Sequence, residues 1–94
     1  MRRYVSEPSA LSASDRRKER KRLTKVQNGK CWLCGASLRQ KPTIAIRRLP
    51  LNKGLFPKGF FSHPVHLHHD HTTGKSVGVV HALCNGVLWE YFGQ

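Results

Sequence analysis

Apolar and polar residues recur most regularly in the last third of the chain, and the pattern there predicts two strands followed by a helix. Residues 66–71 form one strand pattern and residues 76–80 another, with the turn-forming residues 72–75 between them. Residues 84–92 carry apolar side chains at a spacing of four, which indicates a short helix. This order predicts a ββα unit over residues 65–92.

The N-terminal part of the chain is polar and predicts a disordered segment followed by one helix. Residues 1–13 mix Ser, Ala, Glu and Pro without a period, which is typical of disorder. Residues 14–28 read as a basic helix, with Ser14 as the expected N-cap and an Asn-Gly pair at its end. Leu23 and Val26 supply its apolar residues, so we expect the last turn to pack on the domain and the basic start to lie in solvent or on DNA.

The middle of the chain is irregular and predicts a short strand and a long loop. Residues 43–49 contain β-branched residues that favour a strand. Residues 50–64 are interrupted by Pro and Gly, which predicts a loop or a loose hairpin. We expect the large apolar side chains of this loop to cover the edge of the core, with stacking on unpaired bases as the alternative. These side chains are Leu55, Phe56, Phe60 and Phe61.

Length and cysteine content bound the class of protein. The chain has 94 residues, of which 38% are hydrophobic, so we expect one small domain whose core needs additional stabilisation. Three cysteines cannot pair completely as disulfides, and no signal peptide precedes them, which indicates a metal site in a reducing, cytoplasmic compartment. No apolar run approaches the length of a transmembrane helix.

The charge balance indicates a polyanionic partner. The chain carries 17 Lys and Arg against 5 Asp and Glu, a formal net charge of +12. Nucleic acid is the expected partner of such a chain. An anionic membrane surface is less favoured, because no helix sets a long apolar face against its basic one. The basic run within residues 14–28 can be a solvated face, but the overall charge favours contact with DNA.

Four soft metal ligands lie in two close pairs, Cys31 with Cys34 and His81 with Cys84. Zinc takes four N or S ligands in a tetrahedron, and a gap of two residues turns both side chains of a pair toward one point. We therefore expect a structural zinc ion that joins the first pair to the start of the last helix. The alternatives are a redox dithiol, disfavoured because no βαβ pattern surrounds Cys31, and a buried Cys84 beside a surface His81.

A histidine-rich strand precedes the second ligand pair and offers candidates for chemistry. Alternation along a strand places His66, His68 and Asp70 on one face, and His69 and His71 on the other. A neutral imidazole can accept a proton from water, and a divalent cation can stabilise charge on a scissile phosphate. His68 or Asp70 can bind such a cation together with Asn85, which follows Cys84. The alternatives are a helix cap for Asn85, and a second zinc site or polar surface residues for the histidines.

These motifs together resemble the recombination endonuclease VII family, which belongs to the HNH, His-Me finger or ββα-metal nucleases. The matching runs are Gln27-Asn28-Gly29-Lys30-Cys31-x-x-Cys34, His66-Leu67-His68-His69-Asp70-His71 and Thr73-Gly74-Lys75-x-x-Gly78-Val79-Val80-His81-x-x-Cys84-Asn85. They cover residues 27–92 except for an unmatched insertion at 43–64. The resemblance implies a small, zinc-stabilised α+β domain over residues 14–94, with a ββα-metal core at 65–92 and the basic helix in front of it.

The resemblance also implies a role for each motif residue. The four zinc ligands of the family match Cys31, Cys34, His81 and Cys84, with His81 in place of the usual Cys. His69 matches the general base and Asn85 the metal-binding asparagine, while His66 and His71 match histidines near the scissile phosphate. His68 stands where the family usually has an aspartate ligand, and colicin-type HNH nucleases are similar in having His-His there. The implied catalytic cation is Mg²⁺ or Mn²⁺, with Ni²⁺ or another transition metal left open.

The resemblance implies a DNA endonuclease. Such an enzyme hydrolyses phosphodiester bonds, by nicking or double-strand cleavage, with His69 as base and a single divalent cation, and leaves a 5′ phosphate. Lys and Arg of residues 16–25 and 47–58 would hold the backbone. A competing assignment takes Asp70 as ligand and His71 as base. The alternative function is a non-catalytic zinc module that binds nucleic acid.

Two departures from the family bear on mechanism and assembly. Leu88 stands where some members carry an active-site acid, so that role has no candidate. The chain ends shortly after the motif helix, without the helical region through which the junction-resolving member dimerises, so a monomer is expected and a dimer is left open. Small stand-alone members are often phage-encoded, which implies the cytoplasm of a bacterial or phage-infected cell.

Overall fold

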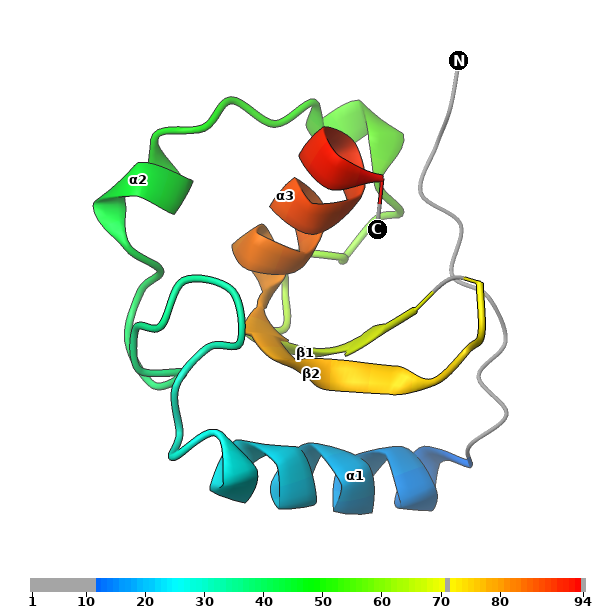
Figure 1. The fold of residues 1–94 in the computed structure, drawn as a ribbon. Coiled ribbons are helices and arrows are strands. Elements are labelled where there is room, and N and C mark those ends of the chain that lie inside the picture. The colour runs from blue at the N-terminus through cyan, green and yellow to red at the C-terminus, as the bar shows by residue number, and fades with distance from the viewer. Residues whose placement is uncertain (1–11, 71, 94) are drawn as a thin grey trace.

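A two-stranded antiparallel sheet with helices on both sides forms the centre of the structure (Figure 1). The computed structural model describes residues 12–70 and 72–93. In chain order the elements are α1 (Ala13–Val26), α2 (Ile44–Arg47), the 3₁₀ helix η1 (Lys53–Leu55), β1 (Val65–His69), β2 (Ser76–His81) and α3 (Ala82–Phe92). In Figure 1 the hairpin lies between α1 and α3. The expected α+β class and the order strand, strand, helix are confirmed.

The β1–β2 ladder contains one irregularity, in β2 opposite the histidine-rich strand. His68 pairs with Gly78, but His69 pairs with Ser76, so one residue of β2 has no partner and a bulge separates the two histidines. A bulge bends the strand and re-aims the side chains that follow it. The extra residue lies in β2, so the bulge changes how β2 faces the histidine-rich strand beyond His68.

The first helix begins earlier than the sequence pattern suggests. The Ser12 hydroxyl accepts a hydrogen bond from the Asp15 amide at 3.1 Å, so Ser12 is the N-cap and the helix begins at Ala13. The expectation that Ser14 caps the helix is wrong. The side chain of Ser12 already accepts from the free amide three residues later, so Ser14 lies inside the first turn. The expected disorder over residues 1–13 lies mostly outside the described residues, but its last two residues belong to the cap and the first turn.

α1 contacts the hairpin through one apolar residue rather than two. Leu23 packs against the main core, whereas Val26 is 67% exposed. The half-buried positions of the helix recur three and four residues apart and include Leu23, and Val26 falls outside that stripe. The predicted packing of Val26 is therefore wrong. The helix ends as expected, with Asn28 at a φ of 57° and Gly29 at 70°.

Residues 43–49 do not form the expected strand, and their central part is the helix α2. The outer edge of β2, where a third strand would pair, is already occupied. The Gln27 amide group accepts from the Val79 N–H at 2.8 Å and donates to the Val79 carbonyl at 2.9 Å, and the Trp32 N–H donates to the same carbonyl at 3.0 Å. β-branched residues cannot extend a sheet whose edge is satisfied by other groups.

The loop over residues 50–64 contains η1 and no strand among its residues. Its Phe56 and Phe60 are buried with Trp89 of α3, in offset and edge-on ring contacts with centroids 4.9 and 5.4 Å from Phe56. Glu90 of α3 accepts a hydrogen bond from the backbone of this loop at 2.9 Å. The expectation that the aromatic residues cover the core is therefore confirmed.

The main core lies at the junction of β2, α3 and the loop after α1. Its buried residues include two of the candidate zinc ligands, and the full set is Cys31, Leu38, Leu67, Val79, Val80, Cys84 and Leu88. Of residues 12–70 and 72–93, no helix has both the length and the apolar character needed to cross a membrane.

Candidate metal centre and histidine–asparagine cluster

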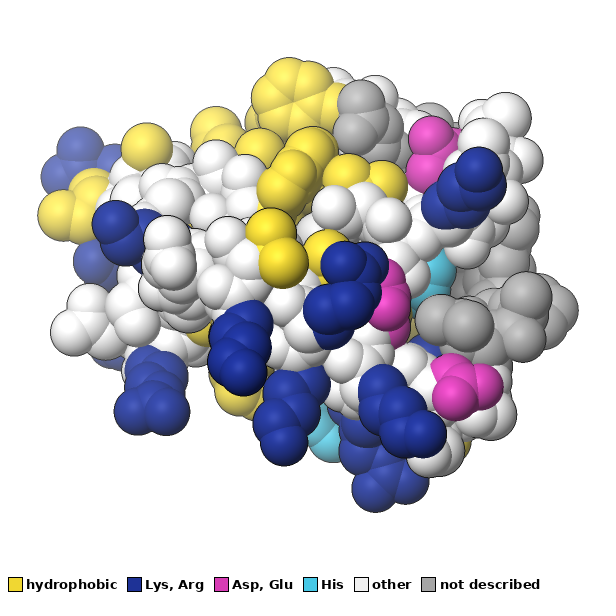
Figure 2. All heavy atoms as spheres, turned by 60° about the horizontal axis from the view of Figure 1, so that its bottom comes forward, with side chains coloured by type: hydrophobic (Ala, Val, Ile, Leu, Met, Phe, Trp, Pro, Cys, Tyr) yellow, Lys and Arg dark blue, Asp and Glu magenta, His cyan; other side chains and the backbone are white. Residues whose placement is uncertain are grey.

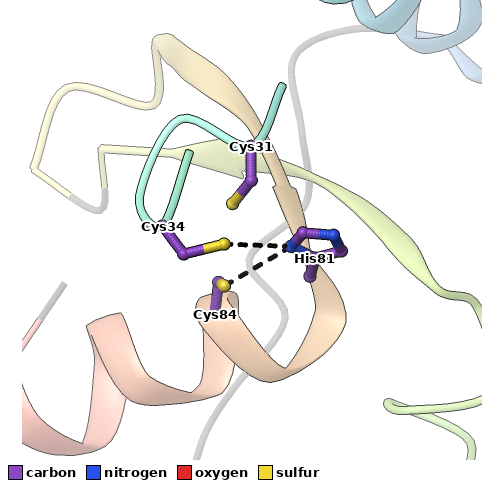
Figure 3. Close-up of side chains that lie close together, drawn as sticks. All are labelled: Cys31, Cys34, His81 and Cys84. Atoms are coloured by element: carbon purple, nitrogen blue, oxygen red, sulfur yellow. Dashed lines mark hydrogen bonds between the residues drawn. The ribbon is translucent and has the colours of Figure 1, made fainter. Parts of the chain in front are cut away.

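Four side chains from three parts of the chain converge on one point, and they are named the Cys/His cluster (Figure 3). Cys31 and Cys34 come from the loop after α1, His81 is the last residue of β2, and Cys84 lies in the first turn of α3. Their ligand atoms all lie within 4.8 Å of one another. The four residues can hold a metal ion, as their paired spacing predicted.

The distances within the Cys/His cluster fit a tetrahedral zinc ion. The Nδ1 atom of His81 lies 3.5 Å from Cys34 Sγ and 3.6 Å from Cys84 Sγ. Zinc bonds of about 2.3 Å to sulfur and about 2.1 Å to nitrogen, at a tetrahedral angle, separate S and N ligands by about 3.6 Å. The donor set of three thiols and one imidazole is also the one that zinc favours. The geometry is consistent with the expected structural zinc.

The His81 ring is held in the tautomer that a metal requires. Its Nε2–H donates to the Ser37 carbonyl oxygen at 2.9 Å, so its Nδ1 carries a lone pair that faces the sulfur atoms. Metal-binding histidines commonly use their second ring nitrogen for such an outer hydrogen bond, which fixes the orientation of the ring. Ser37 therefore belongs to the site, although nothing in the sequence motif marks it.

A hydrogen bond joins two of the thiols, those of Cys31 and Cys84. The Cys84 thiol donates to the Cys31 sulfur, which lowers the pKa of Cys31 to about 4. The same hydrogen bond, together with burial and the nearby sulfur atoms, raises the pKa of Cys84. Both sulfurs are buried, and any proton between them must leave before both can bind an ion, because a metal binds the thiolate form.

A second group, the His/Asn cluster, consists of His66, His68 and Asn85. The Asn85 carboxamide lies between the two imidazoles, with Oδ1 3.2 Å from His68 Nδ1 and Nδ2 3.1 Å from His66 Nδ1. Because a carbonyl oxygen only accepts and an amide nitrogen only donates, His68 carries a proton on Nδ1 and His66 does not. His68 and Asn85 are buried, at 2% and 4% exposure.

The two clusters adjoin, because Cys84 and Asn85 are consecutive residues of α3. The helix N-cap is His81, which makes no side-chain capping hydrogen bond, and Asn85 lies inside the first turns with its side chain on the histidines. Asn85 is therefore not a helix cap, and that alternative is wrong. The predicted placement of Asn85 beside His68 is confirmed.

His66 joins the cluster to the aromatic loop. Its ring meets the Phe60 ring edge-on, with centroids 4.7 Å apart, and burial lowers the pKa of His66. Phe60 lies in the segment that the family motif leaves unmatched, so the motif could not indicate this contact. The feature of the sequence that could have pointed to this contact is the group of aromatic residues in the loop.

The other candidates of the histidine-rich strand are placed differently. His69 follows the bulge and is half-buried, and its Nε2 atom is shielded from solvent. The Asp70 carboxylate accepts hydrogen bonds from the Thr72 and Thr73 amides, at 2.7 and 3.1 Å, and so stabilises the hairpin turn. Asp70 is exposed, whereas His68 and Asn85 are buried. His71 lies outside the described residues.

Basic side chains dominate the face of the molecule that α1 forms. Figure 2, in which the α1 side is turned forward, shows Lys and Arg side chains spread over it with few acidic ones between them. The described α1 carries Glu19 in an ion pair with Arg22, and a groove of about 670 Å³ runs beside the second half of the helix. The residues that line this groove are Arg20, Lys21, Thr24, Lys25, Asn28, Gly29 and Val65.

The sequence motifs thus map onto two neighbouring clusters and a basic groove. Comparison of the chain with protein-family models, curated proteins and solved structures gave no match. The catalytic roles of His66, His68, His69, His71 and Asn85 remain predictions. The metal-binding geometry of the Cys/His cluster is an observation of this structure.

Proposed function

We propose that this chain is a metal-dependent DNA endonuclease of the HNH type, in which the Cys/His cluster holds a structural zinc ion and the His/Asn cluster holds one divalent cation. The observation that carries the proposal is the buried pair of His68 and Asn85 on a hairpin–helix unit, directly beside a zinc ligand. The resemblance of the motif runs to the endonuclease VII family supports the same assignment.

The His68–Asn85 pair fits a hard divalent cation in spacing. Neighbouring ligands of an octahedral ion with bonds of about 2.1 Å lie about 3.0 Å apart. The observed separation of His68 Nδ1 and Asn85 Oδ1 is 3.2 Å. To bind an ion through Nδ1, the neutral His68 imidazole must change tautomer, with one proton lost from Nδ1 and one gained from solvent at Nε2. When bound there, the cation supplies positive charge beside the scissile phosphate and the leaving oxygen.

His69 acts as the general base in this proposal. Its Nε2 is shielded from solvent, so Nδ1 is the nitrogen that meets the attacking water. His69 removes the proton as the water oxygen forms a bond to phosphorus. The P–O3′ bond then breaks, which leaves a 5′ phosphate on one fragment and a 3′ hydroxyl, protonated from solvent, on the other.

The basic face of α1 holds the nucleic acid backbone. Three cationic side chains, those of Arg20, Lys21 and Lys25, line the groove beside the helix. Val65, which precedes His66 on β1, also lines the groove, and this connects the groove with the His/Asn cluster. Such contacts neutralise phosphates without reading bases, so they favour DNA of any sequence and weaken with salt.

Cleavage of supercoiled plasmid by zinc-loaded protein tests the proposal. We expect nicking that requires added Mg²⁺ or Mn²⁺, that is lost in His69→Ala and that persists in His63→Ala, a matched removal of an exposed histidine. Loss of nicking with retained DNA binding in His69→Ala identifies the base. DNA binding without nicking in the wild type, under all cations, would instead establish a non-catalytic zinc module.

A further inference from the structure

Trp32 lies between the two cysteines of the first ligand pair, and its side chain packs on β2. Its backbone N–H donates to the Val79 carbonyl at 3.0 Å, which fixes the loop against the strand. A Cβ atom added to Gly78 would lie 2.7 Å from Trp32 Cγ and 2.9 Å from both Cβ and Cδ1 of Trp32. The indole therefore occupies the space that a side chain at position 78 would need.

This placement brings the indole beside His68. Gly78 is the cross-strand partner of His68, and partners on antiparallel strands present their side chains on the same face. The rings of Trp32 and His68 have centroids 6.0 Å apart with planes tilted by 31°. Trp32 is 45% exposed while His68 is 2% exposed, so the indole forms an outer wall over the imidazole.

We propose that Trp32 is a positioning residue that holds the His68 imidazole against Asn85 and thereby couples the Cys/His cluster to the cation site. The cation-binding part of this inference rests on the proposed function, whereas the orientation of His68 does not. An imidazole with open space beside it can turn away from Asn85, and the indole fills that space. Gly78 is also required for this arrangement, because only a residue without Cβ leaves room for the indole.

The first measurement is the affinity of zinc-loaded protein for Mn²⁺. We expect Trp32→Ala to weaken Mn²⁺ binding by about tenfold, the lower end of the range for residues that orient metal ligands. Trp32→Phe, which keeps an aromatic wall, should restore most of the affinity. Leu33→Ala is the matched control from the same loop, because Leu33 packs against the main core. It should leave Mn²⁺ affinity unchanged.

A double-mutant cycle tests the coupling to position 78. Gly78→Ala should weaken Mn²⁺ binding as Trp32→Ala does, because the new Cβ displaces the indole. In a Trp32→Ala background the same Gly78→Ala change should have a much smaller effect, since the ring is gone and only the Cβ of residue 32 still lies 2.9 Å from the new Cβ, while Gly78 does not have a positive φ. Equal zinc content in all four proteins shows that the Cys/His cluster is intact.

The second measurement is the imidazole Nδ1–H signal of His68 by NMR, which requires no added cation. The wild type should show this proton protected from exchange by its hydrogen bond to Asn85, and Trp32→Ala and Gly78→Ala should lose that protection. Wild-type protection and wild-type Mn²⁺ affinity in zinc-loaded Trp32→Ala would overturn the inference, as would additive effects in the double mutant. Absence of Mn²⁺ binding in the wild type would refute the proposed cation site, and the Nδ1–H signal alone would then decide the role of Trp32.

Discussion

Each cluster contains a residue of α3, and these residues, Cys84 and Asn85, are consecutive. The clusters differ in how many metal-binding atoms they bring together. The Cys/His cluster supplies four ligand atoms within 4.8 Å of one another, with an outer hydrogen bond from His81 to Ser37. The His/Asn cluster brings together two neutral side chains that can bind a cation, His68 and Asn85, and in the proposed function the remaining coordination positions are left to water or substrate. Closed sites are structural and open sites catalytic. In the proposed function, this difference separates a structural task from a catalytic one.

The His/Asn cluster depends on the Cys/His cluster for its position. Asn85 is positioned by the helix turn that carries Cys84, so the open cluster depends on the closed one. The four ligand atoms of the Cys/His cluster, in contrast, include none from His66, His68 or Asn85. Damage to the closed cluster should therefore abolish both functions, while damage to the open cluster should leave zinc binding and folding unchanged.

The largest effect is expected from loss of zinc. Cys84→Ser, or strong chelation of the wild type, should unfold the domain, because zinc binding contributes about 10–16 kcal/mol in small zinc domains and two ligands are core residues. Circular dichroism with elemental zinc analysis measures this. His68→Ala is the control and should remain folded with one zinc ion. A folded, cooperative, zinc-free wild type would contradict the structural role.

The next effect is expected from loss of the base. His69→Ala should lower single-turnover cleavage by about 10²- to 10⁴-fold, because only the proton acceptor is removed, and should keep zinc and DNA binding intact. His71→Ala should be milder and tests the competing assignment. Near-normal cleavage by His69→Ala with loss in His71→Ala would transfer the role of base to His71.

Substitutions of the proposed cation ligands should change the cation concentration that cleavage requires. Asn85→Ala should raise the cation concentration needed for half-maximal cleavage by about 10- to 100-fold, with zinc retained. His68→Asp should remain active and shift its preference toward Mg²⁺, since a carboxylate is a harder ligand than imidazole. Cation titrations of both variants provide the measurement. An unchanged cation requirement in Asn85→Ala would remove Asn85 from the site.

Zinc affinity should depend on pH through the protons of the cysteine thiols. The hydrogen bond to Cys31, together with burial, raises the pKa of the Cys84 thiol, so zinc must displace its proton at neutral pH. Affinity should therefore fall as pH falls, by about tenfold per unit for each proton that the thiols release. Competition with a chelator across neutral pH measures the slope. His68→Ala should give the same slope, and a pH-independent affinity would contradict the assignment.

The smallest effect distinguishes two faces of α1. Replacing Lys21 and Lys25, which line the groove, should weaken duplex binding several-fold and reduce the salt slope by about 1.8, or about 0.9 for each phosphate that is no longer neutralised. Replacing Arg17 and Lys18 removes the same charge from exposed positions that do not line the groove. That pair should leave the salt slope nearly unchanged. Equal slopes for both pairs would show that DNA does not bind along the groove.

The elements and ligands that the sequence predicted are those set by local spacing. The Cys/His cluster follows from two ligand pairs with a gap of two, and the hairpin and last helix follow from apolar periodicity. The predicted strand at 43–49 failed because its β-branched residues require a free sheet edge, and Gln27 and Trp32 occupy that edge. Availability of an edge is a tertiary property that no local pattern reports.

The candidate site was predictable in its members but not in its arrangement. Asn85 beside His68 was expected from adjacent motifs, and the structure confirms the contact. The bulge after His68 was not expected, because it depends on the register with β2. The walls formed by Trp32 and Phe60 were missed for a related reason, since each reaches its histidine from a distant segment.

The most direct test of the account is an end-group analysis of plasmid treated with zinc-loaded wild-type protein, with and without Mg²⁺ or Mn²⁺. The central claim is that the open cluster performs cation-dependent hydrolysis beside a closed zinc site. We expect nicks only with added cation, each bearing a 5′ phosphate and a 3′ hydroxyl. Intact plasmid under every cation, at protein concentrations that bind it fully, would contradict the claim.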